Sequence, residues 1–323
     1  MHNAPDTTVL DAAEGLNVQT KRPFRLAIGR YFGNTGAAIS TVIMVLVLFA
    51  VLFTSITARY GLTEAVIKAG DGNKNQFLPP SKIAWMGTDD LGRDLYSRLL
   101  YGTRSSLFIG ASAGILSLVV GTIIGVFSGL RGGRIDDFIM RVTDIFLAFP
   151  FLVTVIIMRA FLGNLPWLTA IIGDIASYRF LIFLLTLFGW MGVARLVRGS
   201  VLALKEREFV EAARAVGASN TRIAVSHLIP NSIGPLLVSF TIAVVGGLVA
   251  ESTLSFLGLG PQPGSGSTSL GKLIELSAEG ARQGRWWLVA YPCGMLVLLA
   301  VCISFIGDGL RDAFDPKLDK GKG

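Results

Sequence analysis

Residues 105–130 read SSLFIGASAGILSLVVGTIIGVFSGL, a run of apolar and small residues without a single charged side chain. The hydrocarbon core of a bilayer is about 30 Å thick and takes about 20 apolar residues to cross as a helix. In lipid the backbone polar groups of such a run must be satisfied within the segment, which an α-helix does. This stretch therefore predicts an all-α membrane protein.

Five further apolar runs lie on either side of this stretch. Three of them, at 37–58, 232–250 and 286–307, carry no charge, whereas the runs at 145–158 and 180–194 are shorter and bounded by charged residues. We therefore predict six transmembrane helices. The expected organisation is a tail at 1–36, a first span at 37–58, an outer loop at 59–104, a core at 105–307 that contains a long inner loop at 206–230, and a tail at 308–323.

The composition agrees with a membrane protein. Of the 323 residues, 52% are hydrophobic and only 16% are charged, against roughly 25% charged in a typical soluble domain. Two Cys exclude a disulfide scaffold, and no Cys/His spacing suggests zinc. No combination of residues for nucleophilic or acid–base catalysis is visible either. We therefore expect no catalytic residue, no metal site and no cofactor bound by this chain.

The distribution of basic residues sets the expected orientation. Six spans place both termini on one side, and the loops on that side carry more Lys and Arg than the loops on the other. The positive-inside rule then places both termini in the cytoplasm. A polar stretch to about Thr20 precedes the first apolar run, so we expect this run to be an uncleaved signal anchor. The net charge of +7 fits cytoplasmic loops and does not by itself imply nucleic acid.

The inner loop at 206–230 reads EREFVEAARAVGASNTRIAVSHLIP and predicts a helical hairpin. Gly217 is expected to end a first short helix, because glycine tolerates a positive φ. Ser219 or Asn220 can cap a second helix, which is expected to end near Pro230. Such a hairpin can dock a soluble partner, although a solvated connector is an equally simple interpretation. One apolar face of the first helix is expected to hold Phe209, Ala212, Ala213 and Val216.

The polar face of the same helix carries charges of both signs. Arg207 and Glu211 are four residues apart, and Glu211 and Arg214 are three apart. Residues at these spacings are neighbours on a helix surface, so we expect them to pair with one another.

The spacing within this loop resembles the EAA loop of ABC importer permeases. Glu211-Ala212-Ala213 is followed after three residues by Gly217, and after nine more by His227, Ile229 and Pro230. A His at the position of His227 resembles the peptide/nickel branch of that family. Four further segments are similar to this branch: GTDDLGRD at 87–94, Arg131 to Pro150, ESTLSFLG at 251–258 and FIGDGLRD at 305–312. Leu270 departs from the branch, which usually has Trp there, and Arg134 stands where an aromatic is frequent.

The resemblance implies a type I importer permease fold, and specifically the second permease subunit of a dipeptide or oligopeptide importer. In that family the loop is the coupling helix, which sits in a groove of an ATP-binding subunit. The implied partners are a homologous second permease, two ATP-binding subunits that hold ATP and Mg, an extracytoplasmic substrate-binding protein, a peptide substrate and membrane lipid, with no nucleic acid. The implied location is the bacterial plasma membrane. The implied coupling residues are Glu211, Ala212, Ala213, Gly217, His227 and Pro230.

Three alternatives remain open. The same fold can import nickel, glutathione or another small solute. A secondary carrier needs no ATPase, but it would be expected to keep more carboxylates within its spans. A membrane-embedded enzyme would need the catalytic residues that the sequence lacks.

One segment resembles a phosphate-binding loop without being one. Residues 266–273 read GSTSLGKL, which is close to a P-loop. However, that motif needs Ser or Thr after the Lys to hold magnesium, and Leu273 supplies neither. Any use of ATP is therefore expected to go through a partner.

Small and charged residues within the spans give the remaining candidates. Glycines at steps of four and seven residues allow close helix approach, either within this chain, or against a partner permease or around a translocation path: Gly110, Gly114, Gly121, Gly125 and Gly129. Among the charges, Asp144 is expected to pair with Arg141, and Arg159 is expected to extend to the outer interface. Glu251 is the candidate gate residue, with a plain interfacial carboxylate as the alternative.

Overall fold

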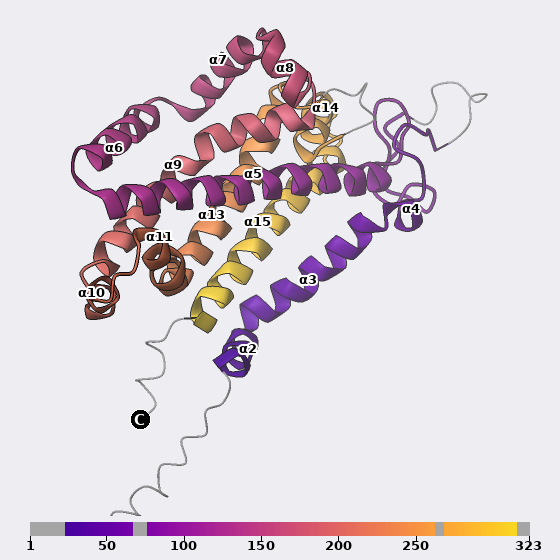
Figure 1. Ribbon diagram of the computed structural model, residues 1–323. Helices are drawn as coiled ribbons and strands as arrows, with labels where there is room; N and C mark the ends of the chain where they lie inside the picture. The colour runs from indigo at the N-terminus through magenta and orange to yellow at the C-terminus, as the bar shows by residue number, and fades with distance from the viewer. Residues whose placement is uncertain (1–22, 67–75, 262–267, 315–323) are drawn as a thin grey trace, which may run out of the picture.

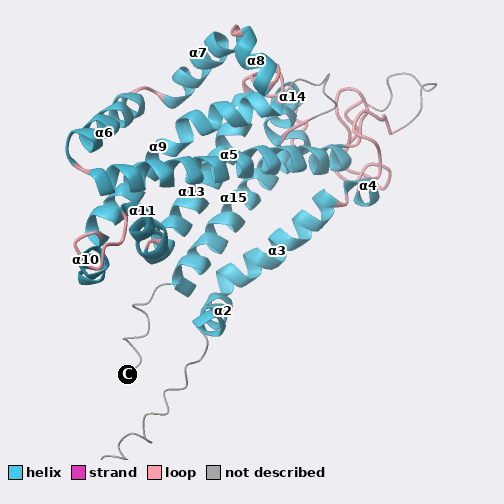
Figure 2. Ribbon diagram, in the orientation of Figure 1, coloured by secondary structure: helices cyan, strands magenta, loops and turns pink. Residues whose placement is uncertain are grey.

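Helices make up most of the chain in the computed structural model, which describes residues 23–66, 76–261 and 268–314 (Figure 2). No strand occurs in these ranges, only isolated β-bridges such as Thr88 with Asp94. The long helices are α3 (Thr35–Leu52), α5 (Leu95–Arg131), α9 (Tyr178–Leu204), α13 (Ile233–Phe256) and α15 (Trp287–Phe314). The shorter ones are α2 (Pro23–Gly33), α4 (Thr54–Thr57), α6 (Gly133–Ala148), α7 (Phe151–Gly163), α8 (Pro166–Ile172), α10 (Glu208–Ala215), α11 (Asn220–Ile223), α12 (Ile229–Asn231) and α14 (Leu270–Arg282), with a π-helical turn η2 (Ala224–Leu228) before α12.

The five long helices are each long and apolar enough to cross a membrane. The pair α6 and α7 adds a sixth candidate span if it is counted as one, although its two halves are bent by 98°. The predicted fold class, an all-α membrane protein, is confirmed, and the six predicted spans correspond to the five long helices and the bent pair of α6 and α7.

The third span differs from the straight helix predicted at 145–158. Pro150 divides this segment, and Phe149 before it adopts an extended conformation with φ −84° and ψ 142°. A proline disfavours helical geometry in the residue that precedes it and clashes with the preceding turn. Counting apolar residues ignores this local effect, so the prediction of one continuous helix was wrong.

The second span starts at Leu95 rather than at 105 because Asp94 caps it. The Asp94 carboxylate accepts hydrogen bonds from the Ser97 backbone N–H at 2.8 Å and from Ser97 Oγ at 2.6 Å, which satisfies a free donor of the first turn. Arg98 lies inside the helix, where it is buried and forms an ion pair with Asp89. Charge at this position therefore does not end the helix, and the expected outer loop at 59–104 is partly helical.

Helix α5 has its most extensive contacts with α9 and α13, and the candidate glycines of α5 lie at these contacts. A Cβ at Gly110 would lie 2.8 Å from Leu248 Cα of α13, and one at Gly125 would lie 2.5 Å from the Ala194 carbonyl oxygen of α9. The same holds for Gly114 against Val244 of α13, and for Gly121 and Gly129 against Val193 and Val201 of α9. Of the two interpretations, the structure therefore places these glycines at contacts within the chain.

The short connecting helices lie at two opposite ends of the bundle. Figure 1 shows α2, α10, α11 and the end of α15 at one end of the bundle, and α4, α8 and α14 at the opposite end. In the same view α6 and α7 lead the chain from the first end back to the second. If α6 and α7 are counted together as one span, the described chain has up to six crossings, with α2 and the end of α15 at the same end of the bundle (Figure 1).

Candidate functional site

The hairpin between α9 and α13, residues 206–231, begins with α10. Glu208 and Glu211 lie in the first turn of α10, where negative charge is favourable to the helix dipole. The turn ends at Gly217, which has φ +85° and donates its N–H to the Arg214 carbonyl at 2.9 Å. The next N–H, of Ala218, bonds to the Ala213 carbonyl at 3.0 Å. These two bonds form a Schellman motif, so the prediction that Gly217 ends the first helix is confirmed.

The second arm of the hairpin runs through α11, η2 and α12. The Ser219 hydroxyl caps α11 by accepting the Arg222 N–H at 3.3 Å, as the sequence predicts. The helical path runs through Pro230 and ends at Asn231, which confirms the predicted end near Pro230. A π-helical turn comes just before the proline, and its last bond joins the Ile229 N–H to the Ala224 carbonyl. This wider turn accommodates a proline ring that would clash with the preceding turn of a regular α-helix.

The hairpin is fixed to the ends of two spans, α5 and α9, by a hydrophobic cluster. Val210, Ile223 and Leu228 are fully buried in it. They pack with Val126 of α5 and with three valines of α9, namely Val193, Val197 and Val201. Because such packing leaves few voids, interiors of this kind transmit displacement rather than absorb it.

The apolar face of α10 differs from the predicted one. Val216 is 89% exposed, Phe209 and Ala212 are also exposed, and Ala213 alone of the predicted set packs on the cluster. The buried side chain is Val210 instead. The reason is that Val216 lies at the end of α10, where the chain reverses, so the helical period no longer applies to it.

The exposed side chains of the hairpin include both apolar and acidic ones. Phe209, Val216 and Val225 are exposed, and so is Glu211; the rings of Phe209 and His227 lie 6.3 Å apart. In the described part of the chain no ion pair joins Glu211 to Arg207 or Arg214, so their predicted pairing was wrong. The structure thus brings His227 beside α10, whereas Pro230 lies exposed further along the second arm.

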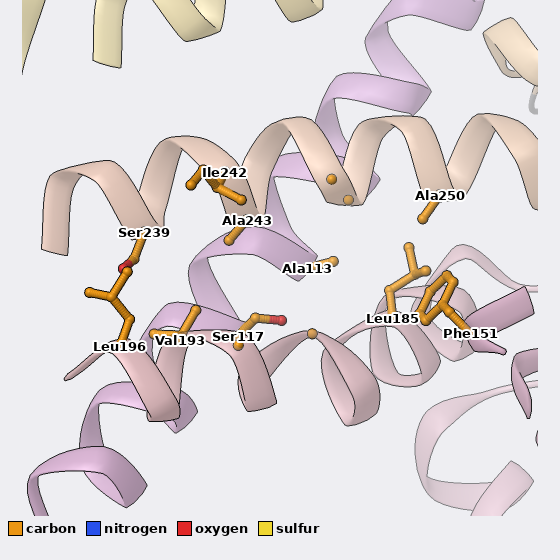
Figure 3. Close-up of a pocket in the computed structure, with 14 residues that line it drawn as sticks. Ala113, Ser117, Phe151, Leu185, Val193, Leu196, Ser239, Ile242, Ala243 and Ala250 are labelled. Carbon is orange, nitrogen blue, oxygen red and sulfur yellow. The ribbon is translucent and has the colours of Figure 1, made fainter. Parts of the chain in front are cut away.

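A cavity of about 390 Å³ lies between α5, α9 and α13, with Phe151 of α7 at one end (Figure 3). Its wall consists largely of glycine, alanine and serine, including Gly189, Gly246 and Ala250. The two hydroxyl groups in the wall belong to Ser117 and Ser239. The sequence motifs did not point to these residues, although the glycines at 189, 192, 246 and 247 were an available signal.

Glu251 lies inside the bundle rather than at an interface. Its carboxylate is fully buried in α13 and accepts hydrogen bonds from Ser106 Oγ of α5 and from Ser255 Oγ, each at 2.6 Å. Ser106 Oγ in turn accepts the Leu270 N–H of α14 at 3.0 Å. Glu251 therefore connects three helices, and the expectation of a plain interfacial carboxylate was wrong.

Two further charges differ from expectation. Arg159 does not extend to an interface: it is buried and donates a hydrogen bond to the Leu259 carbonyl after α13. Asp144 pairs with Arg195 of α9 at 2.5 Å rather than with Arg141. A second pair joins the same two helices, because Asp136 receives bonds from Arg198 Nε at 2.5 Å and Nη2 at 2.6 Å. Periodicity along one helix could not predict partners on another helix.

The P-loop-like segment has a structural role where it is described; Gly266 and Ser267 lie outside the described residues. Ser269 caps α14 by accepting the Lys272 N–H at 3.3 Å, and Lys272 forms an ion pair with Glu275 at 2.5 Å. Within the described ranges no group of three or more His, Cys, Asp or Glu residues could hold a metal ion.

A helical bundle with up to six spans, a hairpin fixed to two of them and a cavity among the central spans together define a polytopic membrane transport subunit. Residues 121–320 match the family described as the binding-protein-dependent transport system inner membrane component. The chain belongs to this family, and its recognition as an ABC importer permease is confirmed.

Relatives match nearly the whole chain. The oligopeptide transport system permease protein OppC of Bacillus subtilis is 35% identical over 311 residues, which cover 95% of this chain and 94% of that protein. The dipeptide transport system permease protein DppC of the same organism is 38% identical over 274 residues, covering 84% and 81%. OppC of Haemophilus influenzae is 37% identical over 313 residues, covering 96% and 93%.

A solved structure shares the fold. A chain of the methionine ABC transporter MetNI, in an inward-facing conformation, superimposes with a TM-score of 0.55 at 21% identity. The match covers 67% of this chain and 96% of that one. It supports the permease fold independently of the sequence relatives.

Proposed function

We propose that this chain is a permease subunit of an ATP-driven importer of dipeptides or oligopeptides in a bacterial plasma membrane. Family membership supports the transport role, and the names of the relatives support the peptide cargo. The observation that carries the proposal is the hairpin, because it is packed on two spans while apolar and acidic side chains on it remain exposed for a partner.

The hairpin is the proposed contact with an ATP-binding subunit. Exposed Phe209, Val216 and Val225 supply apolar area for a groove, and the exposed carboxylate of Glu211 supplies a charge for a basic partner residue. In this proposal the small side chains of Ala212 and Ala213 allow the partner subunit to approach α10 closely. The backbone course of the second arm is determined by Gly217, His227 and Pro230. ATP and Mg are bound by the partner subunits and drive the motion.

The packing beneath the hairpin provides the route for coupling. When two ATP-binding subunits close on ATP, the docked hairpin moves, and its cluster with Val193, Val197 and Val201 moves α9 with it. Shifting a two-state equilibrium from 1:99 to 99:1 takes about 5.5 kcal/mol of differential binding. The hairpin must therefore be attached firmly both to the ATP-binding subunit and to the spans.

The cavity is the proposed half of the translocation pathway, with a homologous second permease supplying the other half. Its wall of glycine and alanine accepts varied side chains because it makes few specific contacts. The hydroxyls of Ser117 and Ser239 can hydrogen-bond to a peptide backbone. An extracytoplasmic binding protein delivers the cargo in this scheme and sets most of its selectivity.

The proposed orientation places the hairpin and both termini in the cytoplasm. The excess of Lys and Arg on this side supports it, and so does the position of α2 and the end of α15 at the hairpin's end of the bundle (Figure 1).

Uptake of labelled dipeptides and pentapeptides into cells with and without this gene tests the proposal, with nickel and glutathione uptake as parallel controls. Loss of peptide uptake alone is the expected result. Loss of nickel or glutathione uptake alone would keep the importer and overturn the peptide cargo. Peptide uptake that continues after removal of the ATP-binding subunits would instead favour a secondary carrier.

A further inference from the structure

Two cavities meet at one side chain. Besides the membrane cavity of about 390 Å³, a second cavity of about 570 Å³, here called the inner cavity, lies nearer the hairpin. The inner cavity is lined by the start of α13, the end of α15 and Ser200 of α9. Leu196 of α9 lines both cavities. The two cavities therefore follow one another along α9 and α13, with Leu196 between them.

Leu196 lies where a side chain could narrow the passage between the two cavities. In Figure 3 Leu196 of α9 points toward Ser239 of α13, at the opposite end of the membrane cavity from Ala250 and Phe151. Leu196 is 38% exposed and lines both cavities, so it borders open space rather than lying within the core. A bulky apolar side chain at a narrow point excludes water and thereby hinders hydrated solutes.

Helix α9, which carries Leu196, also contacts the hairpin and α6 through residues next to Leu196. Neighbouring Val193 and Val197 pack into the cluster under the hairpin. Arg195 and Arg198 form ion pairs with Asp144 and Asp136 of α6. The same two turns of α9 thus carry the attachment of the hairpin on one face and Leu196 on another, so a displacement of the hairpin also displaces Leu196.

We propose that Leu196 is the inner gate of the pathway, the apolar side chain that separates the membrane cavity from the inner cavity. This inference rests on the proposed function for the identity of the cargo, but the barrier itself is a property of this chain's geometry. Leu196 acts by its size and apolarity, and it makes no hydrogen bond to a cargo.

Cysteine accessibility tests this gate without any cargo. The two native cysteines, Cys293 and Cys302, are replaced by alanine, and Ala250→Cys then provides a single reporter at the far end of the membrane cavity. Ser200→Cys, in the inner cavity, is the matched control. A charged, membrane-impermeant methanethiosulfonate reagent is applied from the cytoplasmic side to inside-out vesicles that hold the assembled transporter. Leu196→Ala, wild-type Leu196 and Leu196→Trp form a size series.

The expected result is a graded rate of modification at Ala250→Cys, fastest with Leu196→Ala and about tenfold slower with Leu196→Trp than with leucine, a barrier increase of about 1.4 kcal/mol. Modification of Ser200→Cys should remain unchanged throughout. Equal rates at Ala250→Cys across the series would overturn the gate, and so would equal changes at both reporters. A graded rate without peptide uptake would leave the gate standing and refute only the cargo.

Discussion

Single residues with unusual backbone conformations or buried hydrogen-bond partners determine the local geometry of the hairpin and of the bundle around Glu251. Gly217 is the clearest case, because its φ of +85° lies in the left-handed region. No atom lies within 4 Å of a Cβ built there, so the penalty for a side chain is conformational rather than steric. That penalty is about 1–2 kcal/mol for an ordinary L-residue, and Asn is one of the few residues that tolerate this region.

Replacement of Gly217 is therefore expected to loosen the turn in a graded way. Gly217→Ala should increase the rate of limited proteolysis within the hairpin of the purified transporter and reduce uptake, whereas Gly217→Asn should stay closer to the wild type in both measurements. If alanine and asparagine behaved alike, the turn geometry would not be the property that matters.

Ser106 satisfies two buried groups at once. Its hydroxyl donates to Glu251 and accepts the N–H of Leu270. Ser106→Ala leaves both groups short of a partner, and we expect it to destabilise the protein by about 1–3 kcal/mol. The unfolding midpoint of the detergent-solubilised protein measures this change.

The neighbouring serine provides the control. Within the described part of the chain, Ser105 Oγ donates to the Tyr101 carbonyl of its own helix, at 3.3 Å, and to no other group. Ser105→Ala is therefore expected to change the stability by no more than about 0.5 kcal/mol. Equal midpoints for the two variants would show that the network around Glu251 does not stabilise the bundle.

At the scale of elements, α6 is connected to α9 by two ion pairs that differ mainly in burial. The side chains of Asp136 and Arg198 are 7% and 28% exposed, whereas those of Asp144 and Arg195 are 64% and 50% exposed. Charge-assisted hydrogen bonds that are shielded from water contribute about 1.5–3 kcal/mol, while exposed pairs contribute about 0–1 kcal/mol. The connection between the helices therefore depends on the Asp136 pair.

Alanine substitution of each aspartate tests this difference. Asp136→Ala is expected to lower the stability by about 1.5–3 kcal/mol, and Asp144→Ala by less than about 1 kcal/mol, both measured as shifts of the unfolding midpoint. The reverse order would mean that burial does not determine the strength of these pairs.

Some helices and turns could be predicted from the sequence, and others could not. The uncharged runs predicted four spans because hydrophobicity alone decides them, and the pattern around Gly217 and Ser219 predicted the turn of the hairpin because capping is local. The break at Pro150 was missed because apolar counting ignores backbone restriction. The start of α5 was missed because the partner of Arg98 lies in the preceding loop.

At the scale of the whole molecule, one continuous path of packing leads from the hairpin to the membrane cavity. The hairpin packs on Val193 and Val197, and Val193 itself also lines the cavity. The sequence could identify the hairpin through its motif, but not the cavity. The cavity depends on how α5, α9 and α13 meet, and on small residues whose facing directions only the folded bundle determines.

The central claim is that the hairpin couples ATP hydrolysis in partner subunits to movement of peptide through the spans. The direct measurement is the number of labelled peptides imported per ATP hydrolysed, in proteoliposomes that hold the complete transporter. The comparison includes Glu211→Lys on the docking surface, and Glu206→Lys, an exposed acidic residue just before α10, as the charge-matched control.

We predict that Glu211→Lys retains ATP hydrolysis and lowers this ratio by about tenfold, which lies within the range of typical coupling free energies of about 1–3 kcal/mol. Glu206→Lys should keep the wild-type ratio. A wild-type ratio in Glu211→Lys would contradict the claim that this surface transmits the work of ATP hydrolysis to the permease.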